Sequence, residues 1–135
     1  MDLFVYGTLL FPQVLAVLLG RVPPRTPAVA PGWRAAALPA RPYPGLVPEQ
    51  GRAAPGLLMR GLDEAERRIL DAYEDREYLL TEIHVDGGRR CLAYVWRHEV
   101  LDEDWDARSF AASHLDGYVR YCRRWRAGHL AGATP

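Results

Sequence analysis

Residues 78–98 read YLLTEIHVDGGRRCLAYVWRH, and this stretch decides the fold class. Two runs rich in aliphatic and aromatic residues, Tyr78–Val85 and Cys91–His98, flank the letters DGG at 86–88, a sequence typical of a tight β-hairpin turn. Apolar side chains fall on both faces of the second run, which is typical of a central strand. We therefore expect an antiparallel hairpin in the middle of a sheet or barrel.

Helical patterns occur in three other parts of the chain. Pro12 suits the first position of a helix that Gly20 ends, and Asp63 opens a capping pattern ahead of a helix over Glu64–Tyr73. A last helix is expected over residues 107–126, with ring side chains at helical spacing. These side chains are Phe110, His114, Tyr118, Tyr121 and Trp125. Within this stripe we expect His114 to be a satisfied core histidine rather than a metal ligand.

Most of the prolines lie between residues 21 and 56. Because proline has no backbone N–H, long central strands are not expected here, and short edge strands are expected at 28–30, 34–38 and 45–47. A first buried strand is expected at Leu3–Tyr6. The whole pattern predicts an α+β fold, a small mixed β-barrel with outlying helices. We expect one domain over residues 1–126 and a flexible C-terminal tail over 127–135.

Composition excludes several classes of function. The formal net charge is zero, so no global field favours nucleic acid or a membrane surface, and neither is expected as a partner. All 17 basic residues are Arg, which excludes Schiff-base chemistry by a lysine. The arginines of the last helix raise RNA binding as an alternative, but a solvated helix face is the stronger interpretation.

Cysteine and histidine positions predict neither a disulfide framework nor a metal centre. Cys91 and Cys122 are the two cysteines, and no pair of histidines has metal-ligand spacing. The N-terminus begins with an acidic residue, and Gly7 and Pro12 break its apolar run, so we expect no signal peptide. No apolar stretch approaches the roughly 20 residues of a membrane-spanning helix. These features favour a cytoplasmic location.

Residues 6–9, with the sequence Tyr6-Gly7-Thr8-Leu9, end the first strand and form one candidate site. A glycine that lets the chain turn exposes consecutive backbone N–H groups, which bind carboxylates or developing oxyanions. A purely structural strand-to-helix turn is the alternative. A second candidate is the segment 43–48, YPGLVP, where Tyr43 could present its ring at a pocket rim, although a plain turn is the alternative.

Glu74 is the candidate for proton transfer. It follows Leu70 by four residues and so continues the buried side of its helix, near the helix C-terminus. Partial burial and the helix dipole both raise the pKa of a carboxylate towards the range useful for acid and base catalysis. The alternative is a solvated acid paired with Arg76 or Arg67.

Three motifs together resemble the gamma-glutamylcyclotransferase-like superfamily. The stretch FVYGTL at 4–9 is similar to its opening fingerprint, RPYPGLVP at 41–48 to its internal tyrosine-proline segment, and residues 56–78 to the segment with its catalytic acid. The closest likeness is to the plant avirulence-induced-gene (AIG2-like) branch, where an Asp also follows the Glu. Two positions depart from many members: Asp75 stands where they have Gly, and Leu80 where they have a basic residue.

The resemblance implies an enzyme that cyclises a small gamma-glutamyl substrate and releases 5-oxoproline with an amine or amino acid. It implies that Glu74 is the general acid and base and that no cofactor or metal takes part. The substrate would contact Tyr6, Gly7, Thr8, Leu9, Tyr43 and Tyr78. A monomer or homodimer is expected. The alternative is a non-catalytic small-ligand binding or interaction module on the same fold.

Overall fold

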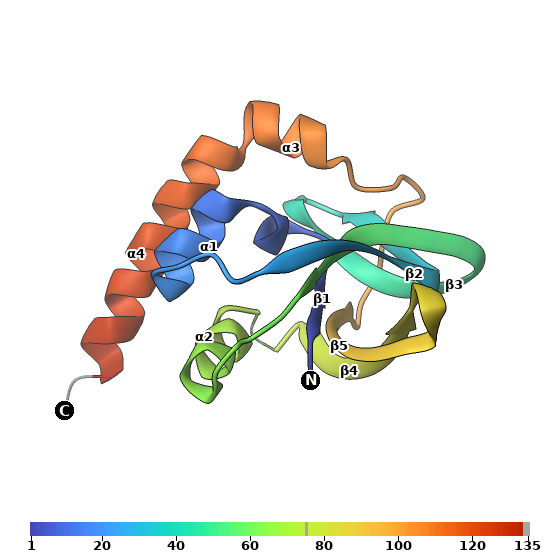
Figure 1. Ribbon diagram of the computed structural model, residues 1–135. Helices are drawn as coiled ribbons and strands as arrows, with labels where there is room; N and C mark the ends of the chain where they lie inside the picture. Colours follow the sequence, from blue (N-terminus) through green and yellow to red (C-terminus); the bar gives the residue numbers. More distant parts are fainter. Residues whose placement is uncertain (75, 134–135) are drawn as a thin grey trace.

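The computed structural model describes residues 1–74 and 76–133, and within them five strands form one mixed sheet with four α-helices around it (Figure 1). The strands are β1 (Leu3–Val5), β2 (Arg25–Leu38), β3 (Arg41–Met59), β4 (Tyr78–Val85) and β5 (Arg89–Trp96). The helices are α1 (Pro12–Leu19), α2 (Glu64–Glu74), α3 (Ala107–Ser113) and α4 (Leu115–Ala133), with short 3-10 turns η1 (Thr8–Leu10) and η2 (Asp86–Gly88). The expected α+β class is confirmed.

The short strand β1 lies in the middle of the sheet, whose order is β2-β3-β1-β5-β4. It pairs antiparallel with β3 and parallel with β5, where Leu3 stands opposite Leu92. Beyond the end of β1, Leu46 of β3 pairs directly with Val95 of β5. The sheet therefore bends over the end of β1, where the turn at residues 6–9 begins.

The sheet is not closed into the small barrel that we expected. β2 and β4 are its two ends, and no ladder of backbone hydrogen bonds joins them within the described residues. A side chain makes a link there instead, since the Asp86 carboxylate accepts a hydrogen bond from the Val29 amide at 2.9 Å. The expected mixed sheet therefore forms, but it does not close into a barrel.

The proline-rich segment forms one long hairpin, so the expectation of short edge strands is wrong. β2 and β3 pair antiparallel over nearly their whole lengths, with two register shifts. Alternate residues of a strand point their N–H groups in the same direction, and Pro42, Pro44 and Pro48 stand at such alternate positions. These positions face away from β2, towards the side where β1 pairs with β3. Because β1 has only three residues, most of β3 has no strand on that side to accept a backbone hydrogen bond, and a missing N–H costs little there.

The helix and the hairpin predicted from the middle of the chain are confirmed. The Glu66 amide donates to Asp63 Oδ1 at 2.8 Å, and the Asp63 amide donates to Glu66 Oε1 at 3.0 Å, which is a capping box. α2 runs from this cap to Glu74. β4 and β5 flank η2 at the DGG turn, and β5 lies between β1 and β4 as its two apolar faces indicate.

The last helical segment is broken, so the expectation of one helix over 107–126 is wrong. Asp106 caps α3, because its Oδ1 accepts hydrogen bonds from the Arg108 and Ser109 amides at 2.9 and 3.3 Å. α3 ends at His114, whose φ of −127° is not helical, and this residue is exposed rather than part of the core. α4 is helical as far as Ala133, which includes most of the segment expected as a tail, and 134–135 lie outside the described residues.

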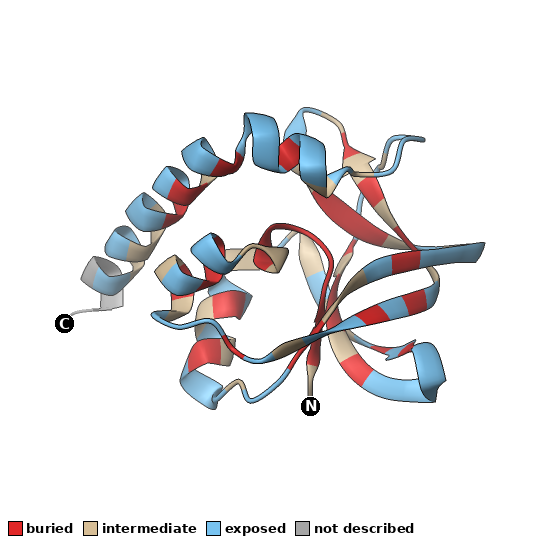
Figure 2. Cartoon of the chain, turned by 45° about the horizontal axis from the view of Figure 1, so that its top comes forward, coloured by how far each residue is buried: buried red, intermediate tan, exposed pale blue. Residues whose placement is uncertain are grey.

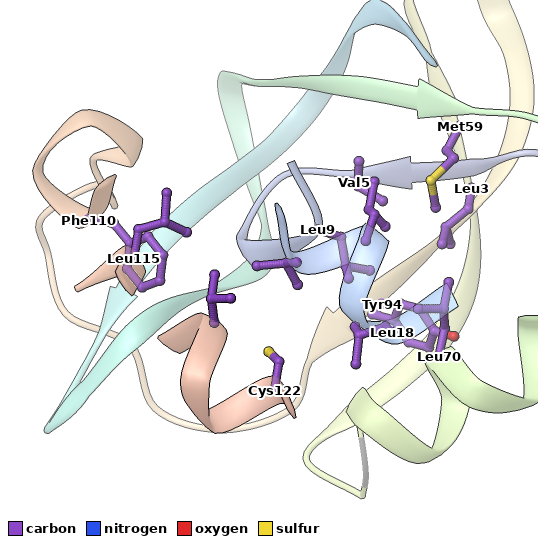
Figure 3. Packing of buried hydrophobic residues seen from close by; sticks show 13 residues of the cluster. Leu3, Val5, Leu9, Leu18, Met59, Leu70, Tyr94, Phe110, Leu115 and Cys122 are labelled. Atoms are coloured by element: carbon purple, nitrogen blue, oxygen red, sulfur yellow. The ribbon is translucent and has the colours of Figure 1, made fainter. Parts of the chain in front are cut away.

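The main core lies between the sheet and the three helices α1, α2 and α4. Figure 2 shows that the buried residues of α4 face α1, while its other side is exposed. Figure 3 shows Leu9, Leu18, Leu70 and Cys122 directed into this core from η1, α1, α2 and α4. The core therefore fixes the position of the turn after β1 relative to the end of α2 and to α4.

Candidate active site

The turn after β1, the end of α2 and part of α4 surround one cavity of about 510 Å³. Small-molecule sites typically have volumes of about 300–1,000 Å³. The seven residues predicted for the site all line this cavity: Tyr6, Gly7, Thr8, Leu9, Tyr43, Glu74 and Tyr78. The first turn and the end of the middle helix, which are far apart in the sequence, therefore face the same space.

Glu74, the last residue of α2, presents its carboxylate to the cavity. The carboxylate forms no hydrogen bond or ion pair with the described residues, and Arg67 instead donates to the Met1 carbonyl. Every fully buried side-chain oxygen or nitrogen of the described residues has a hydrogen-bond partner. The Glu74 carboxylate oxygens have none among these residues, so they are not fully buried and border the space of the cavity. Burial raises the pKa of Glu74 to about 8. Such an environment suits a proton-transfer group, and neither Arg67 nor Arg76 forms an ion pair with Glu74 among the described residues.

Gly7 allows the turn at residues 6–9 to pack directly against the proline segment. A Cβ on Gly7 would lie 2.7 Å from Pro44 Cγ and 2.9 Å from Pro44 Cδ, closer than a side chain tolerates. Thr8 and Leu9 are the first residues of η1, so their amides have no partner within that turn. These amides are suited to an anionic group, and the Thr8 hydroxyl adds a polar group beside them.

All seven tyrosines of the chain line this cavity. The Tyr6 hydroxyl donates to the Tyr94 carbonyl at 2.6 Å and accepts from the Leu46 amide at 3.2 Å. The Tyr94 hydroxyl donates to Asp71 Oδ1 at 2.5 Å. Burial raises the pKa of both phenols, so both remain protonated at neutral pH. Tyr6 therefore holds β5 and β3 around the cavity, since both the donor and an acceptor site of its hydroxyl are occupied by backbone.

The wall formed by residues 42–44 is held from two sides. The Tyr78 hydroxyl donates to the Pro44 carbonyl at 2.7 Å, and the Trp105 indole N–H donates to the Pro42 carbonyl at 2.7 Å. Trp105 belongs to the acidic loop before α3, which lies against β2 through hydrogen bonds such as that from the Ala37 amide to the Glu103 carbonyl. The segment that carries Tyr43 is therefore a fixed wall.

Sequence reasoning missed the tyrosines that α2, β5 and α4 contribute to the cavity. Tyr73, Tyr118 and Tyr121 belong to helical stripes that resembled ordinary core, and Tyr94 to a strand face. Nothing in the spacing separates such residues from core aromatics. A polar tip on each ring was the available signal, because a buried tyrosine needs a hydrogen-bond partner and phenylalanine does not.

The charged residues that line the cavity are Glu74 and Glu77, both acidic. Glu77 forms an ion pair with Arg41 at 2.6 Å, so its charge is compensated. Among the described residues, no group of three or more His, Cys, Asp or Glu side chains is arranged to hold a metal ion. The chemistry that these residues can supply is therefore proton transfer by Glu74 together with hydrogen bonding by amides and hydroxyls.

Comparison with known proteins identifies the family. Residues 3–109 match the family described as gamma-glutamyl cyclotransferase, AIG2-like. The chain belongs to this family. AIG2-like protein C of Arabidopsis thaliana is 31% identical to this AIG2-like chain over 132 residues, which cover 92% of the chain and 77% of the relative. The resemblance seen in the three motifs is confirmed.

Solved structures agree with the family assignment. An Arabidopsis thaliana protein with a solution structure is 28% identical, covers 92% of the AIG2-like chain and 80% of its own, and superposes with a TM-score of 0.68. A gamma-glutamyl cyclotransferase of known structure is 13% identical and covers 72% of this chain and 66% of its own, with a TM-score of 0.60. The second likeness concerns the fold alone. None of the described helices combines the length and hydropathy needed to cross a membrane.

Proposed function

We propose that the protein is a cyclotransferase that cleaves a gamma-glutamyl amide by intramolecular aminolysis and releases 5-oxoproline with an amine or amino acid. The observation that carries this proposal is the Glu74 carboxylate, which has no partner among the described residues, on a cavity that the amide turn at residues 7–9 also lines. Membership of the gamma-glutamyl cyclotransferase, AIG2-like family supports it.

The reaction exchanges one amide bond for another. The substrate's own α-amine attacks its side-chain carbonyl carbon, a C–N bond forms, and the C–N bond to the leaving amine breaks. The α-ammonium nitrogen loses two protons as it becomes the lactam N–H, and the leaving nitrogen gains two and departs as an ammonium group, so the net proton count is zero. The substrate supplies its own nucleophile, and the main tasks of the protein are to bend the substrate and to move the protons. Bending holds the amine against the carbonyl carbon, and such proximity lowers the activation free energy by up to roughly 7–11 kcal/mol in favourable systems.

Glu74 takes a proton from the α-amine and delivers one to the leaving nitrogen. Its pKa of about 8 lies far closer to that of an amine than the ordinary carboxyl value of 4.5 does, so proton transfer from the substrate's ammonium group to Glu74 costs less free energy than transfer to an ordinary carboxylate. Positioned proton transfer of this kind contributes about 10²–10⁴-fold to rate. The Thr8 and Leu9 amides hold the substrate carboxylate or the oxyanion, and Tyr6, Tyr43 and Tyr78 form walls of the pocket.

The direct test is to incubate the protein with a panel of gamma-glutamyl amines and dipeptides and to quantify 5-oxoproline. We expect turnover by the native protein, loss of at least 10²-fold in Glu74→Gln, and unchanged turnover in the matched control Glu64→Gln, an exposed acid on the same helix. Because the ionised carboxylate is the base, kcat/KM should rise with pH through about 8. A fully active Glu74→Gln variant would remove this residue from the mechanism. Calorimetric binding of these substrates without any 5-oxoproline would favour the non-catalytic binding module.

A further inference from the structure

Three hydroxyl groups from separate parts of the chain are linked at the cavity wall. Thr8 Oγ1 of η1 lies 3.1 Å from the Tyr73 hydroxyl of α2, and that hydroxyl is also hydrogen-bonded to the Tyr118 hydroxyl of α4. The Cys122 thiol donates weakly to Tyr73 at 3.8 Å. Thr8, Tyr73 and Tyr118 all line the cavity. The proposed reaction gives no role to Tyr73 or Tyr118.

Counting protons shows what this chain of hydroxyls can do. Burial raises the pKa of both Tyr73 and Tyr118, so both phenols remain protonated at neutral pH. Each hydroxyl then carries one proton, and the two hydrogen bonds use two of the three. The Cys122 thiol already occupies one of the two acceptor sites of the Tyr73 oxygen, so Tyr73 accepts one of the two hydroxyl bonds and donates the other. The remaining proton therefore lies at one end, on Thr8 or on Tyr118. Whichever end holds it is a donor towards the cavity, and the other end is an acceptor.

An anion at the amide turn selects one of these two arrangements. If a carboxylate accepts the Thr8 proton, Tyr73 donates to Thr8 and Tyr118 donates to Tyr73. The lone pairs of Tyr118 are then left facing the cavity as an acceptor. Thr8 and Tyr118 are both hydrogen-bonded to the single Tyr73 hydroxyl, so the donor and the acceptor lie within two hydrogen-bond lengths of each other. A neighbouring donor and acceptor complement a group that has a carboxylate and an amine on the same carbon.

We propose that Thr8, Tyr73 and Tyr118 form a hydroxyl relay that recognises an α-amino acid head group, with Thr8 as donor to its carboxylate and Tyr118 as acceptor for its amine. The inference rests on the proposed function and deepens it, because the amine that Tyr118 holds is the nucleophile that Glu74 deprotonates. Tyr118 lies outside residues 3–109, the part of the chain that matches the family. The relay therefore adds a recognition residue from α4 to the site.

The test compares two probes that differ in the amine alone, L-glutamine and glutaramate, which is the same molecule without the α-amine. Affinities are measured by calorimetry, and 5-oxoproline is quantified at the end of each titration. We expect Tyr118→Phe to lower the affinity for L-glutamine about ten-fold, the value of one hydrogen bond to a charged group, and that for glutaramate less than two-fold. Thr8→Val should weaken both probes, whereas Thr8→Ser, which keeps the hydroxyl, should leave both near the native values.

The control variant and the remaining outcomes separate a failure of the relay from a failure of the proposed function. Arg124→Gln, at an exposed position of α4, is the control for changes in the helix, and melting temperatures check folding. Equal losses for both probes in Tyr118→Phe, or no loss for L-glutamine, would overturn the relay while leaving the proposed function intact. If Tyr118→Phe fails to fold, Thr8→Val decides, since unchanged binding of both probes by that variant overturns the relay. Failure of the native protein to bind either probe would overturn the proposed function and the relay together.

Discussion

Glu74→Gln should make the protein more stable at alkaline pH while it removes activity. The carboxyl group has an ordinary pKa of 4.5 in the unfolded chain and a pKa of about 8 in the folded protein. Between these values the unfolded state releases the proton and the folded state keeps it. Folded-state stability therefore falls as pH rises from about 4.5 to 8, and it levels off above 8. Glutamine has nearly the same shape and does not titrate, so the variant escapes this loss.

The magnitude follows from the size of the pKa difference. One pH unit of separation corresponds to about 1.4 kcal/mol, which gives an upper value of about 5 kcal/mol over the whole interval. Because the carboxylate reaches the space of the cavity, solvent reduces this cost, and we expect a gain of about 2–3 kcal/mol for the variant at pH 8.5. At pH 5 the two proteins should differ little.

Urea unfolding at half-unit steps from pH 5 to pH 9 measures this difference directly. The native protein, Glu74→Gln and Glu64→Gln are compared, and the free energy of unfolding of Glu64→Gln should follow the native curve because Glu64 is exposed. The decisive quantity is the difference between the curves of the native protein and Glu74→Gln. A difference that stays constant across the pH range would refute the raised pKa and, with it, the argument that Glu74 is tuned for proton exchange with an amine.

Three further substitutions test how the cavity is built. Gly7→Ala should cost about 1–3 kcal/mol of stability and disturb ligand binding, because the new Cβ would lie 2.7 Å from Pro44 Cγ, and thermal melting measures the loss. Tyr6→Phe should cost about 1–3 kcal/mol in urea unfolding, since it leaves a buried carbonyl of β5 and a buried amide of β3 without a partner. Asp63→Ala should cost about 1 kcal/mol by loss of the helix cap and leave the affinity for ligands unchanged; a lowered affinity would show that α2 moves as a unit.

The parts of the fold that could be predicted are those set by neighbouring residues. The capping box at Asp63 depends on four consecutive residues, and the DGG turn on three, so local chemistry was sufficient for α2 and for the β4–β5 hairpin. The long β2–β3 hairpin was missed because the cost of a proline depends on whether its N–H would have had a partner. That in turn depends on the length of β1, which is tertiary information.

The break at His114 was missed for a similar reason. The ring side chains of the last segment keep helical spacing across it, while the helix is interrupted there between α3 and α4, and α4 then packs beside α1. The site shows the same division. Glu74 and residues 6–9 could be selected from helix position, turn chemistry and resemblance to the family. The contribution of Tyr118 depends on how α4 packs, and no local pattern encodes this.

The cavity joins the two ends of the chain, because η1 follows the first strand and Tyr118 belongs to the last helix. Its walls are complete only after nearly the whole polypeptide has folded. Contacts between residues so far apart in the sequence form slowly compared with α2 or the β4–β5 hairpin. A small molecule that contacts both η1 and α4 binds only when α4 is packed, and it therefore stabilises the packed position of α4 by mass action. Occupancy of the pocket and attachment of the last helix are thus two aspects of one equilibrium.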